Sequence, residues 1–249
     1  MFFIDIALFY LGALMTSFYL LLGNRLIKKQ TILGHSYCDH CKHDLSLIEV
    51  LPLIGYLIQL GKCRYCKVKI SFKYPLVELF GGLMVLIGYQ IYGFHSEFYV
   101  LMILYFVFLI TIVTDVQEML VFDRIWLIGA LLVIIVRIGD GNLLEYLISS
   151  VSLFMILYAI SIVSSKIYQK EALGGGDVKL YLFIGLTLTF LQGLLSLFIA
   201  SFVALIYVVL TKRSKEAYLP LVPFLFIGVT VSFLYGKEWI TWYLSLLGA

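Results

Sequence analysis

Charged residues are scarce in this sequence. Asp, Glu, Lys and Arg make up only 13% of its 249 residues, whereas hydrophobic residues make up 62%. An ordinary soluble domain carries roughly 25% charged residues, and the apolar residues here form long runs along the whole chain. These features exclude a soluble globular protein and predict that lipid is the solvent for most of the chain.

Basic residues are absent before Arg25. A secretory signal peptide begins with basic residues and has a shorter apolar core, whereas here the positive charge follows an apolar run over residues 2–23. That run is long enough to cross about 30 Å of hydrocarbon. We therefore expect an uncleaved first transmembrane helix whose C-terminal end faces the cytoplasm.

Eight apolar runs predict an all-α polytopic membrane protein with about eight transmembrane helices. The fourth and sixth runs are shorter than the ~17 residues of a full crossing, so they must include flanking residues or be reshaped by packing. The runs are residues 2–23, 76–93, 98–114, 124–138, 143–165, 179–192, 194–211 and 219–236.

The positive charges predict the orientation. With the N-terminus outside, every lysine and arginine except Arg137 and Lys237 falls in a cytoplasmic loop or at the helix end beside it. We therefore expect a multi-pass protein of the cell (cytoplasmic) membrane. Its predicted parts are a first helix (1–23), a cytoplasmic insert (24–75) and a membrane domain (76–249).

Cysteine occurs only in the insert, as two C-x2-C pairs separated by 21 residues. This spacing is typical of a closed structural zinc site with four thiolate ligands. The cytoplasm keeps thiols reduced, which argues against structural disulfides; a redox role and unligated thiols stay open as alternatives. His35, His40 and His43 are substitute ligands that four adequate thiolates make unnecessary. The predicted zinc ligands are Cys38, Cys41, Cys63 and Cys66.

Two aspartates stand at the ends of apolar runs, where ionisable groups are costly and are candidates for function. Asp115 follows the third run and Asp177 precedes the sixth, so the expected topology brings both carboxylates to the cytoplasmic face. Taken singly, Asp115 can mark where a helix meets water, and Asp177 can cap a helix. Taken together, the two can share one proton and hydrolyse an amide bond without a metal or a serine or cysteine nucleophile.

Three glycines precede Asp177 and leave no side chain to block access to it. Gly174-Gly175-Gly176-Asp177, followed by Val-Lys-Leu, resembles the GxGD motif of the type IV prepilin peptidases, a family of membrane aspartic peptidases. Asp115 matches the aspartate that this family has at the end of an earlier span. The likeness extends to the cysteine pairs and to segments 74–79 and 220–224.

This resemblance implies an aspartic endopeptidase that cleaves the basic leader from prepilins or pseudopilins, with Asp115 and Asp177 as catalytic residues. Asp123 stands where the family usually has Pro-Asp, but Phe122 precedes it here, and it either caps the fourth span or takes part in catalysis. Glu78 either contacts substrate or caps a helix. The residues expected to bind substrate or support catalysis are Gly174, Gly175, Gly176, Lys179, Asp123 and Glu78.

Many members of this family also N-methylate the new N-terminus with S-adenosylmethionine, an activity associated with the cytoplasmic insert. A glycine-rich Rossmann loop is absent from the insert. An insert of this size around a tetracysteine centre cannot hold an ordinary nucleotide domain. Any methyl-donor site would therefore be shared with the membrane part.

Two other functions fit the same residues. A non-enzymatic transporter or channel would use the two aspartates to conduct protons or cations, with the zinc insert as a docking module. Another GxGD enzyme, such as a preflagellin or signal-peptide peptidase, is disfavoured by the tetracysteine insert.

The basic residues around the second cysteine pair partly offset the charge of a zinc tetrathiolate, so no nucleic-acid partner is expected. The lipid bilayer is the expected surrounding.

Overall fold

The computed structural model describes residues 2–32, 34–169, 174–212, 219–246 and 248. Lys170, Arg213 and Lys215, which contribute to the predicted orientation, lie outside these ranges. Within the ranges the chain forms helices and two isolated β-bridges but no strand, so the predicted all-α fold is confirmed. The chain divides into two compact units, Met1–Phe98 and Tyr99–Ala249.

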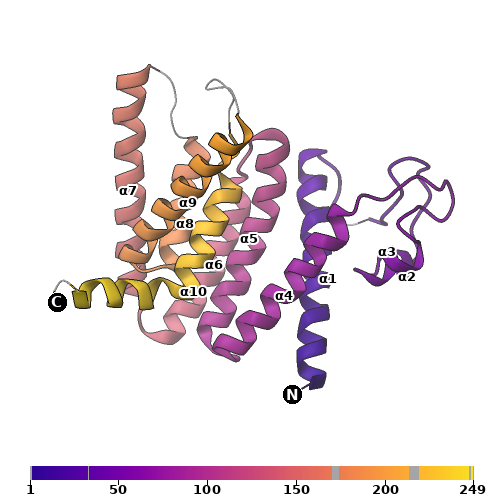
Figure 1. The fold of residues 1–249 in the computed structure, drawn as a ribbon, viewed down its shortest axis with the longest axis horizontal. Helices are drawn as coiled ribbons and strands as arrows, with labels where there is room; N and C mark the ends of the chain where they lie inside the picture. The colour runs from indigo at the N-terminus through magenta and orange to yellow at the C-terminus, as the bar shows by residue number, and fades with distance from the viewer. Residues whose placement is uncertain (1, 33, 170–173, 213–218, 247, 249) are drawn as a thin grey trace. The chain divides into compact units, whose positions relative to one another are not determined.

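The first unit contains two long helices that pack against each other, α1 (Phe2–Ile27) and α4 (Lys73–Tyr92). Glycines allow the close approach: a Cβ on Gly12 would lie 2.7 Å from the Gly81 carbonyl oxygen, and one on Gly82 would lie 2.8 Å from that of Phe9. Small residues serve this purpose in many membrane helix pairs. The insert between the two helices contains the short helices α2 (Leu47–Val50) and α3 (Ile54–Ile58) (Figure 1).

The second unit is a helical bundle in which consecutive helices run in opposite directions (Figure 1). Its core helix, α8, is mostly apolar and buried after Lys179 and contacts four other helices of the unit, as expected for a helix surrounded by protein. The helices are α5 (Ser96–Glu118), which begins in the first unit, α6 (Asp123–Asp140), α7 (Leu143–Tyr168), α8 (Gly175–Thr187), α9 (Phe190–Thr211) and α10 (Val222–Leu246).

Every predicted apolar run corresponds to a helix. Within the described residues, α1, α4, α5, α7 and α9 are long and apolar enough to cross a membrane. The other three differ for visible reasons: α6 carries charged residues at both ends, α8 has only 13 residues, and α10 contains Lys237 and Glu238. The chain is a multi-pass membrane protein.

The predicted end of the sixth run, at residue 192, was wrong, because α8 ends at Thr187 and α9 begins at Phe190. A capping box starts the new helix: the Thr189 N–H and hydroxyl both donate to Gln192 Oε1, at 3.1 and 2.9 Å. Side chains bind the last carbonyls of α8, with Arg137 donating to Thr187 O (3.1 Å) and Ser149 to Leu188 O (2.9 Å). A helix of this length can therefore end inside the bundle.

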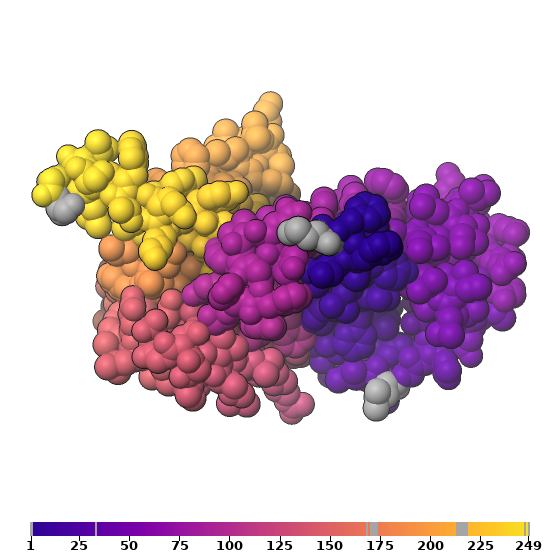
Figure 2. Space-filling model, turned by 90° about the horizontal axis from the view of Figure 1, so that it is seen from below, coloured from indigo at the N-terminus to yellow at the C-terminus, as the bar shows by residue number. Residues whose placement is uncertain are grey.

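The eighth run, predicted to end at residue 236, continues as helix to Leu246. The last part of α10 turns away from the first part and protrudes at the edge of the second unit (Figures 1 and 2). It exposes Trp239, Trp242 and Tyr243. Aromatic side chains of this kind prefer the boundary between hydrocarbon and water.

Candidate functional site

Asp115 lies in the last turn of α5, and only 5% of its surface is exposed. Its Oδ2 accepts a hydrogen bond of 3.0 Å from the backbone N–H of Val222. Val222 is the first residue of α10, whose N–H groups have no partner within their own helix. Asp115 therefore does not simply mark where α5 meets water: it is a buried carboxylate that joins the ends of two helices.

Asp177 lies in the first turn of α8 and is half-buried. The helix begins at Gly175 after the N-cap Gly174, and no side chain caps it. The capping interpretation of Asp177 is therefore not supported. Its Oδ1 is buried and has no hydrogen-bond partner among the described residues.

The ends of α5 and α8 lie near each other within the second unit. Gly176, which precedes Asp177, packs against Val121, and Val121 follows the end of α5 at Glu118 by three residues. Tyr181 follows Asp177 by one helical turn, is buried, and its hydroxyl group lies 3.3 Å from Ser196 Oγ. The sequence interpretation missed Tyr181 and Val222; the i to i+4 spacing from Asp177 is the signal that points to Tyr181.

The three glycines before Asp177 have different surroundings. A Cβ on Gly176 would lie 2.8 Å from the Val121 Cβ, so this glycine lets α8 approach the segment between α5 and α6. A Cβ on Gly174 would lie 3.0 Å from Asp177 Oδ2, whereas one on Gly175 would meet no atom within 4 Å. Gly174 thus makes room for the Asp177 carboxylate, Gly176 makes room for Val121, and Gly175 leaves the backbone accessible.

Lys179 and Asp123 form an ion pair of 2.9 Å beside Asp177, with about half of each side chain exposed. Asp123 Oδ1 also accepts a hydrogen bond of 3.1 Å from Trp126 Nε1. Asp123 is the first residue of α6, whose N-cap is Phe122, and its carboxylate binds side chains rather than the helix backbone. The pair therefore connects the start of α6 to the second turn of α8, one turn from the glycines, and the predicted capping role of Asp123 is not observed.

The cysteine pairs lie on two hairpins with the same backbone hydrogen bonds. In the first, Cys38 N–H donates to His43 O (2.9 Å) and Lys42 N–H to Cys38 O (2.8 Å). In the second, Cys63 N–H donates to Val68 O (2.9 Å) and Lys67 N–H to Cys63 O (3.0 Å). Each hairpin turns at a lysine with positive φ, 59° in both cases. The two halves of the site are thus built alike.

The four cysteine sulfurs lie within 4.8 Å of one another. Cys38 Sγ is 3.9 Å from Cys66 Sγ, and Cys41 Sγ is 4.0 Å from Cys63 Sγ. A tetrahedral ion with metal–sulfur bonds of about 2.3 Å separates its sulfurs by about 3.8 Å, whereas a disulfide requires about 2.05 Å. The donor set fits a bound metal ion.

Two further features concern the ligands of this site. Backbone N–H groups of Cys66 and Tyr65 bind the Cys63 sulfur and lower the pKa of that thiol to about 7, which favours the ligating thiolate. Within the described residues the metal-type cluster contains no histidine, and the His43 ring instead packs 3.5 Å from the Tyr65 ring.

Glu78 is the sixth residue of α4 and is buried. Its Oε2 accepts a hydrogen bond of 2.9 Å from the N–H of Leu53, the residue of positive φ (60°) between α2 and α3. Glu78 therefore does not cap the start of α4. It fixes the insert to the membrane helix.

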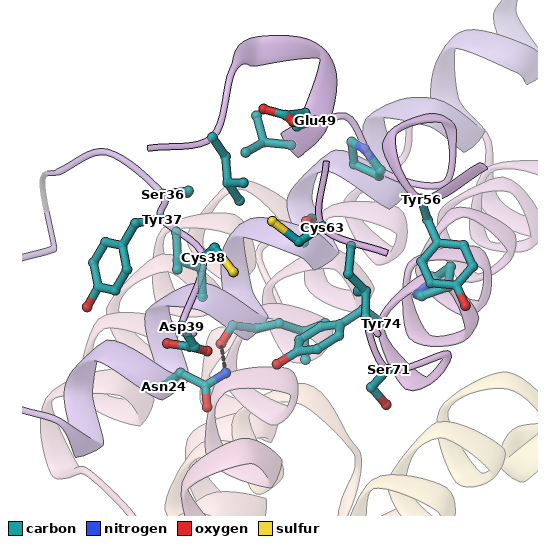
Figure 3. A pocket seen from close by; sticks show the side chains of 18 of the residues that line it. Asn24, Ser36, Tyr37, Cys38, Asp39, Glu49, Tyr56, Cys63, Ser71 and Tyr74 are labelled. Atoms are coloured by element: carbon teal, nitrogen blue, oxygen red, sulfur yellow. Dashed lines mark hydrogen bonds between the residues drawn. The ribbon is translucent and has the colours of Figure 1, made fainter. Parts of the chain in front are cut away.

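A cavity of about 740 Å³ lies in the first unit between α1, the insert and the start of α4 (Figure 3). Glu49, Tyr56 and Tyr74 line it, and the cysteine site forms part of its wall. Glu49 Oε1 and Gln59 Oε1 are buried without a partner in the described part of the chain. These two acceptors are available to a hydrogen-bond donor inside the cavity.

Comparison with known proteins agrees with the division of the chain into two units. Residues 10–92 match the bacterial peptidase A24 N-terminal domain, and residues 102–209 match the type IV leader peptidase family. The first match covers α1, the insert and α4, and the second begins within α5 and includes both aspartates.

The chain is also similar to individual curated proteins. It is 28% identical over 246 residues to a prepilin leader peptidase/N-methyltransferase of Bacillus subtilis, covering 96% of this chain and 97% of the relative. A Vibrio cholerae protein of the same name is 31% identical over 208 residues, with coverage of 80% and 81%. A type 4 prepilin-like proteins leader peptide-processing enzyme of Escherichia coli is 32% identical over 203 residues, with coverage of 79% and 74%. No solved structure matches the chain.

The resemblance first seen in the GxGD motif thus extends along almost the whole chain. The matched ranges include the cysteine hairpins of the first unit and both Asp115 and Asp177 of the second. The chain belongs to the type IV leader peptidase family.

Proposed function

We propose that this chain is an aspartic endopeptidase that removes the basic leader from prepilins or pseudopilins, with Asp115 and Asp177 as its catalytic pair. The observation that carries the proposal is the packing of the start of α8 against the segment that follows α5, because Asp115 lies in the last turn of α5 and Asp177 in the first turn of α8. The names of the similar proteins, which refer to leader peptide processing, support the substrate class.

The reaction requires two proton transfers. One carboxylate takes a proton from a water molecule, whose oxygen adds to the scissile carbonyl carbon, and the other donates a proton to the leaving nitrogen as the C–N bond breaks. The Val222 N–H orients Asp115, while Asp177 Oδ1 keeps its capacity to accept a hydrogen bond from water or substrate. Because the two acids share a proton, they titrate as a pair.

The first turn of α8 is proposed as the surface that meets the substrate backbone. Gly175 is exposed with open space around it, so an extended peptide can approach the helix end closely. The Asp123–Lys179 pair holds the start of α6 against the second turn of α8 and so positions Asp177 without reacting itself.

The proposed orientation has the N-terminus outside and both aspartates at the cytoplasmic face of the cell membrane. In this orientation all lysines and arginines except Arg137 and Lys237 lie on the cytoplasmic side. The positive residues of a prepilin leader then lie near an acidic pair, which is a favourable electrostatic arrangement.

Peptide cleavage by the purified protein tests this function. In detergent, the protein should cut a synthetic peptide between a basic leader and the apolar helix that follows it. If the peptide stays intact, the function as a transporter or channel is favoured instead. If preflagellin or signal-peptide leaders are cut in preference to prepilin leaders, the chain acts as a different GxGD enzyme.

The metal in the cysteine site is proposed to be zinc, in a structural role. Four thiolates form a closed ligand set that leaves no position for water or substrate. Cys38, Cys41, Cys63 and Cys66 would hold the ion and so keep the two hairpins together.

N-methylation of the new N-terminus, with S-adenosylmethionine as donor, is proposed as a second activity. The cavity of about 740 Å³ lies within the range of small-molecule sites, and the Glu49 and Gln59 acceptors suit hydroxyl and ammonium donors. The bound cofactor would supply an electrophilic methyl group. The cavity lies between the insert and the membrane helices, as expected for an insert without a nucleotide domain of its own.

A further inference from the structure

The two short helices of the insert expose a cluster of aliphatic side chains. The exposed fractions are 84% for Leu47, 54% for Ile48, 68% for Leu57, 60% for Ile58 and 84% for Leu60. Contiguous apolar surface of this kind is rare on the water-exposed face of a soluble segment and indicates an interaction site. A purely cytoplasmic insert does not account for it.

The position of these helices along α1 gives the first indication of what covers them. Figure 1 shows α2 and α3 level with the middle of α1, with the loops of the insert drawn above them. The cavity between α1 and the insert reaches Leu14, which lies 13 residues before the end of α1 at Ile27. At 1.5 Å per residue this is about 20 Å along the helix axis. The α2–α3 segment therefore lies beside the part of α1 that crosses the hydrocarbon.

Several backbone groups of the segment have side-chain partners within the protein, as a lipid environment requires, and the Glu49 and Gln59 side chains, whose Oε1 atoms have no such partner, line the cavity. The Leu53 N–H between the two helices donates to Glu78 of α4. Gln59 Nε2 donates to the carbonyl oxygens of Glu49 and Gly55, each at 3.1 Å. Glu49, the one charged residue between positions 45 and 61, is buried and accepts the Ser46 N–H at 2.8 Å.

The charges of the insert lie on its hairpins instead. Lys42, Lys62, Arg64, Lys67 and Lys69 are all exposed, and they flank the α2–α3 segment in sequence. Basic residues beside an apolar segment complement the anionic headgroups at the cytoplasmic surface of a membrane.

We propose that residues 46–60 form a re-entrant segment whose exposed side chains contact lipid acyl chains, while the hairpins lie among the headgroups. The chain enters the bilayer beside α1, turns at Leu53, and returns to the surface before the second cysteine pair. The inference depends on the membrane location of α1 and α4 and does not depend on peptidase activity.

Carbene labelling from lipid acyl chains tests this proposal on the native protein. The full chain is placed in nanodiscs that contain a phospholipid with a diazirine near the end of one acyl chain, and it is digested with trypsin after photolysis. Cleavage after Lys42 and Lys62 releases residues 43–62, which contain the whole segment, and residues 30–42 contain the first hairpin. We expect label on 43–62 at a level similar to that on residues 1–25, and at least several-fold less on 30–42.

If the segment contacts water or protein in place of lipid, the labelling pattern will differ. An unlabelled 43–62 peptide beside a labelled 1–25 peptide would overturn the proposal, as would cross-links from this segment to the second unit or to another copy of the chain in place of lipid. In a paired experiment, Leu57→Glu with Leu60→Glu, which adds no trypsin site, should lower the acyl-chain label on the segment several-fold. Ile32→Glu, at an exposed position outside the segment, serves as the matched control and should leave the label unchanged.

Discussion

Single residues around Asp177 show how local space determines the site. The motif Gly174-Gly175-Gly176-Asp177 indicates an acid that can be approached closely, but its three glycines are not equivalent. Gly176 faces the Val121 side chain, Gly174 faces the Asp177 carboxylate, and Gly175 faces open space. The sequence predicts the need for glycine here, whereas only the folded arrangement distinguishes the three positions.

Gly176→Ala should therefore be destabilising, because a methyl group 2.8 Å from the Val121 Cβ must displace it. The expected cost is about 1–3 kcal/mol, as for other overpacked sites, together with a loss of cleavage as Asp177 moves. Gly175→Ala should leave the melting temperature unchanged or slightly raised, because alanine favours a helix. Thermal unfolding in detergent compares the two variants, and equal melting temperatures would contradict this packing argument.

The helices could be predicted from the sequence where a run of apolar residues alone determines their position. All eight apolar runs became helices, but the end of α8 was not predicted, because the apolar run continues through Leu188 and into α9. The Thr189 and Gln192 capping box was present in the sequence as a local signal. The contact of Arg137 with the last turn of α8 has no such local signal, because it joins residues 50 positions apart.

Arg137 should be important for the stability of α8. It is buried, donates to Thr187 O, lies 3.6 Å from Asp140 and stacks 3.7 Å from the Tyr146 ring. Arg137→Ala is expected to destabilise the protein by about 3 kcal/mol, because it leaves buried partners unsatisfied. Arg137→Lys should restore only part of this, because an ammonium group cannot both stack and donate in the same fork geometry. Full recovery in the lysine variant, measured by thermal unfolding, would argue against this role.

We expect a bound metal ion to hold the two cysteine hairpins together. Protein purified without chelator is expected to contain about one zinc per chain by mass spectrometry, and Cys41→Ser or Cys63→Ser should lose most of it. His40→Ala and His43→Ala are matched controls and should retain it, because the metal-type cluster includes neither histidine. A chain without zinc, or zinc that depends on a histidine, would refute the four-thiolate site.

At the scale of the whole molecule, the residues of the two proposed activities belong to different compact units. The sequence predicted the all-α membrane fold, the cysteine pairs and a common membrane face for the two aspartates. It could not predict the contacts of Glu78 with Leu53 or of Asp115 with Val222, because these join backbone groups to side chains far away in sequence. It also gave no sign of the cavity with its unpartnered Glu49 and Gln59 oxygens.

The two proposed activities should therefore be separable by mutation. Glu49→Gln is expected to weaken S-adenosylmethionine binding by about tenfold, equivalent to about 1.4 kcal/mol, and to leave peptide cleavage unchanged. Asp177→Asn should show the reverse pattern. Isothermal titration with the methyl donor, run beside the cleavage assay, measures both. If Glu49→Gln leaves donor binding unchanged, the cavity is not the donor site.

The most direct test of the central claim is the cleavage rate of the two aspartate variants and of their combination. Asp115→Asn and Asp177→Asn should each lower the turnover of a prepilin-like peptide by a factor of about 100 or more, while Asp5→Asn in α1 should match the wild type. Because the two acids act as one unit, the double variant should be hardly slower than either single variant. Near wild-type cleavage by either single variant would contradict a shared catalytic pair.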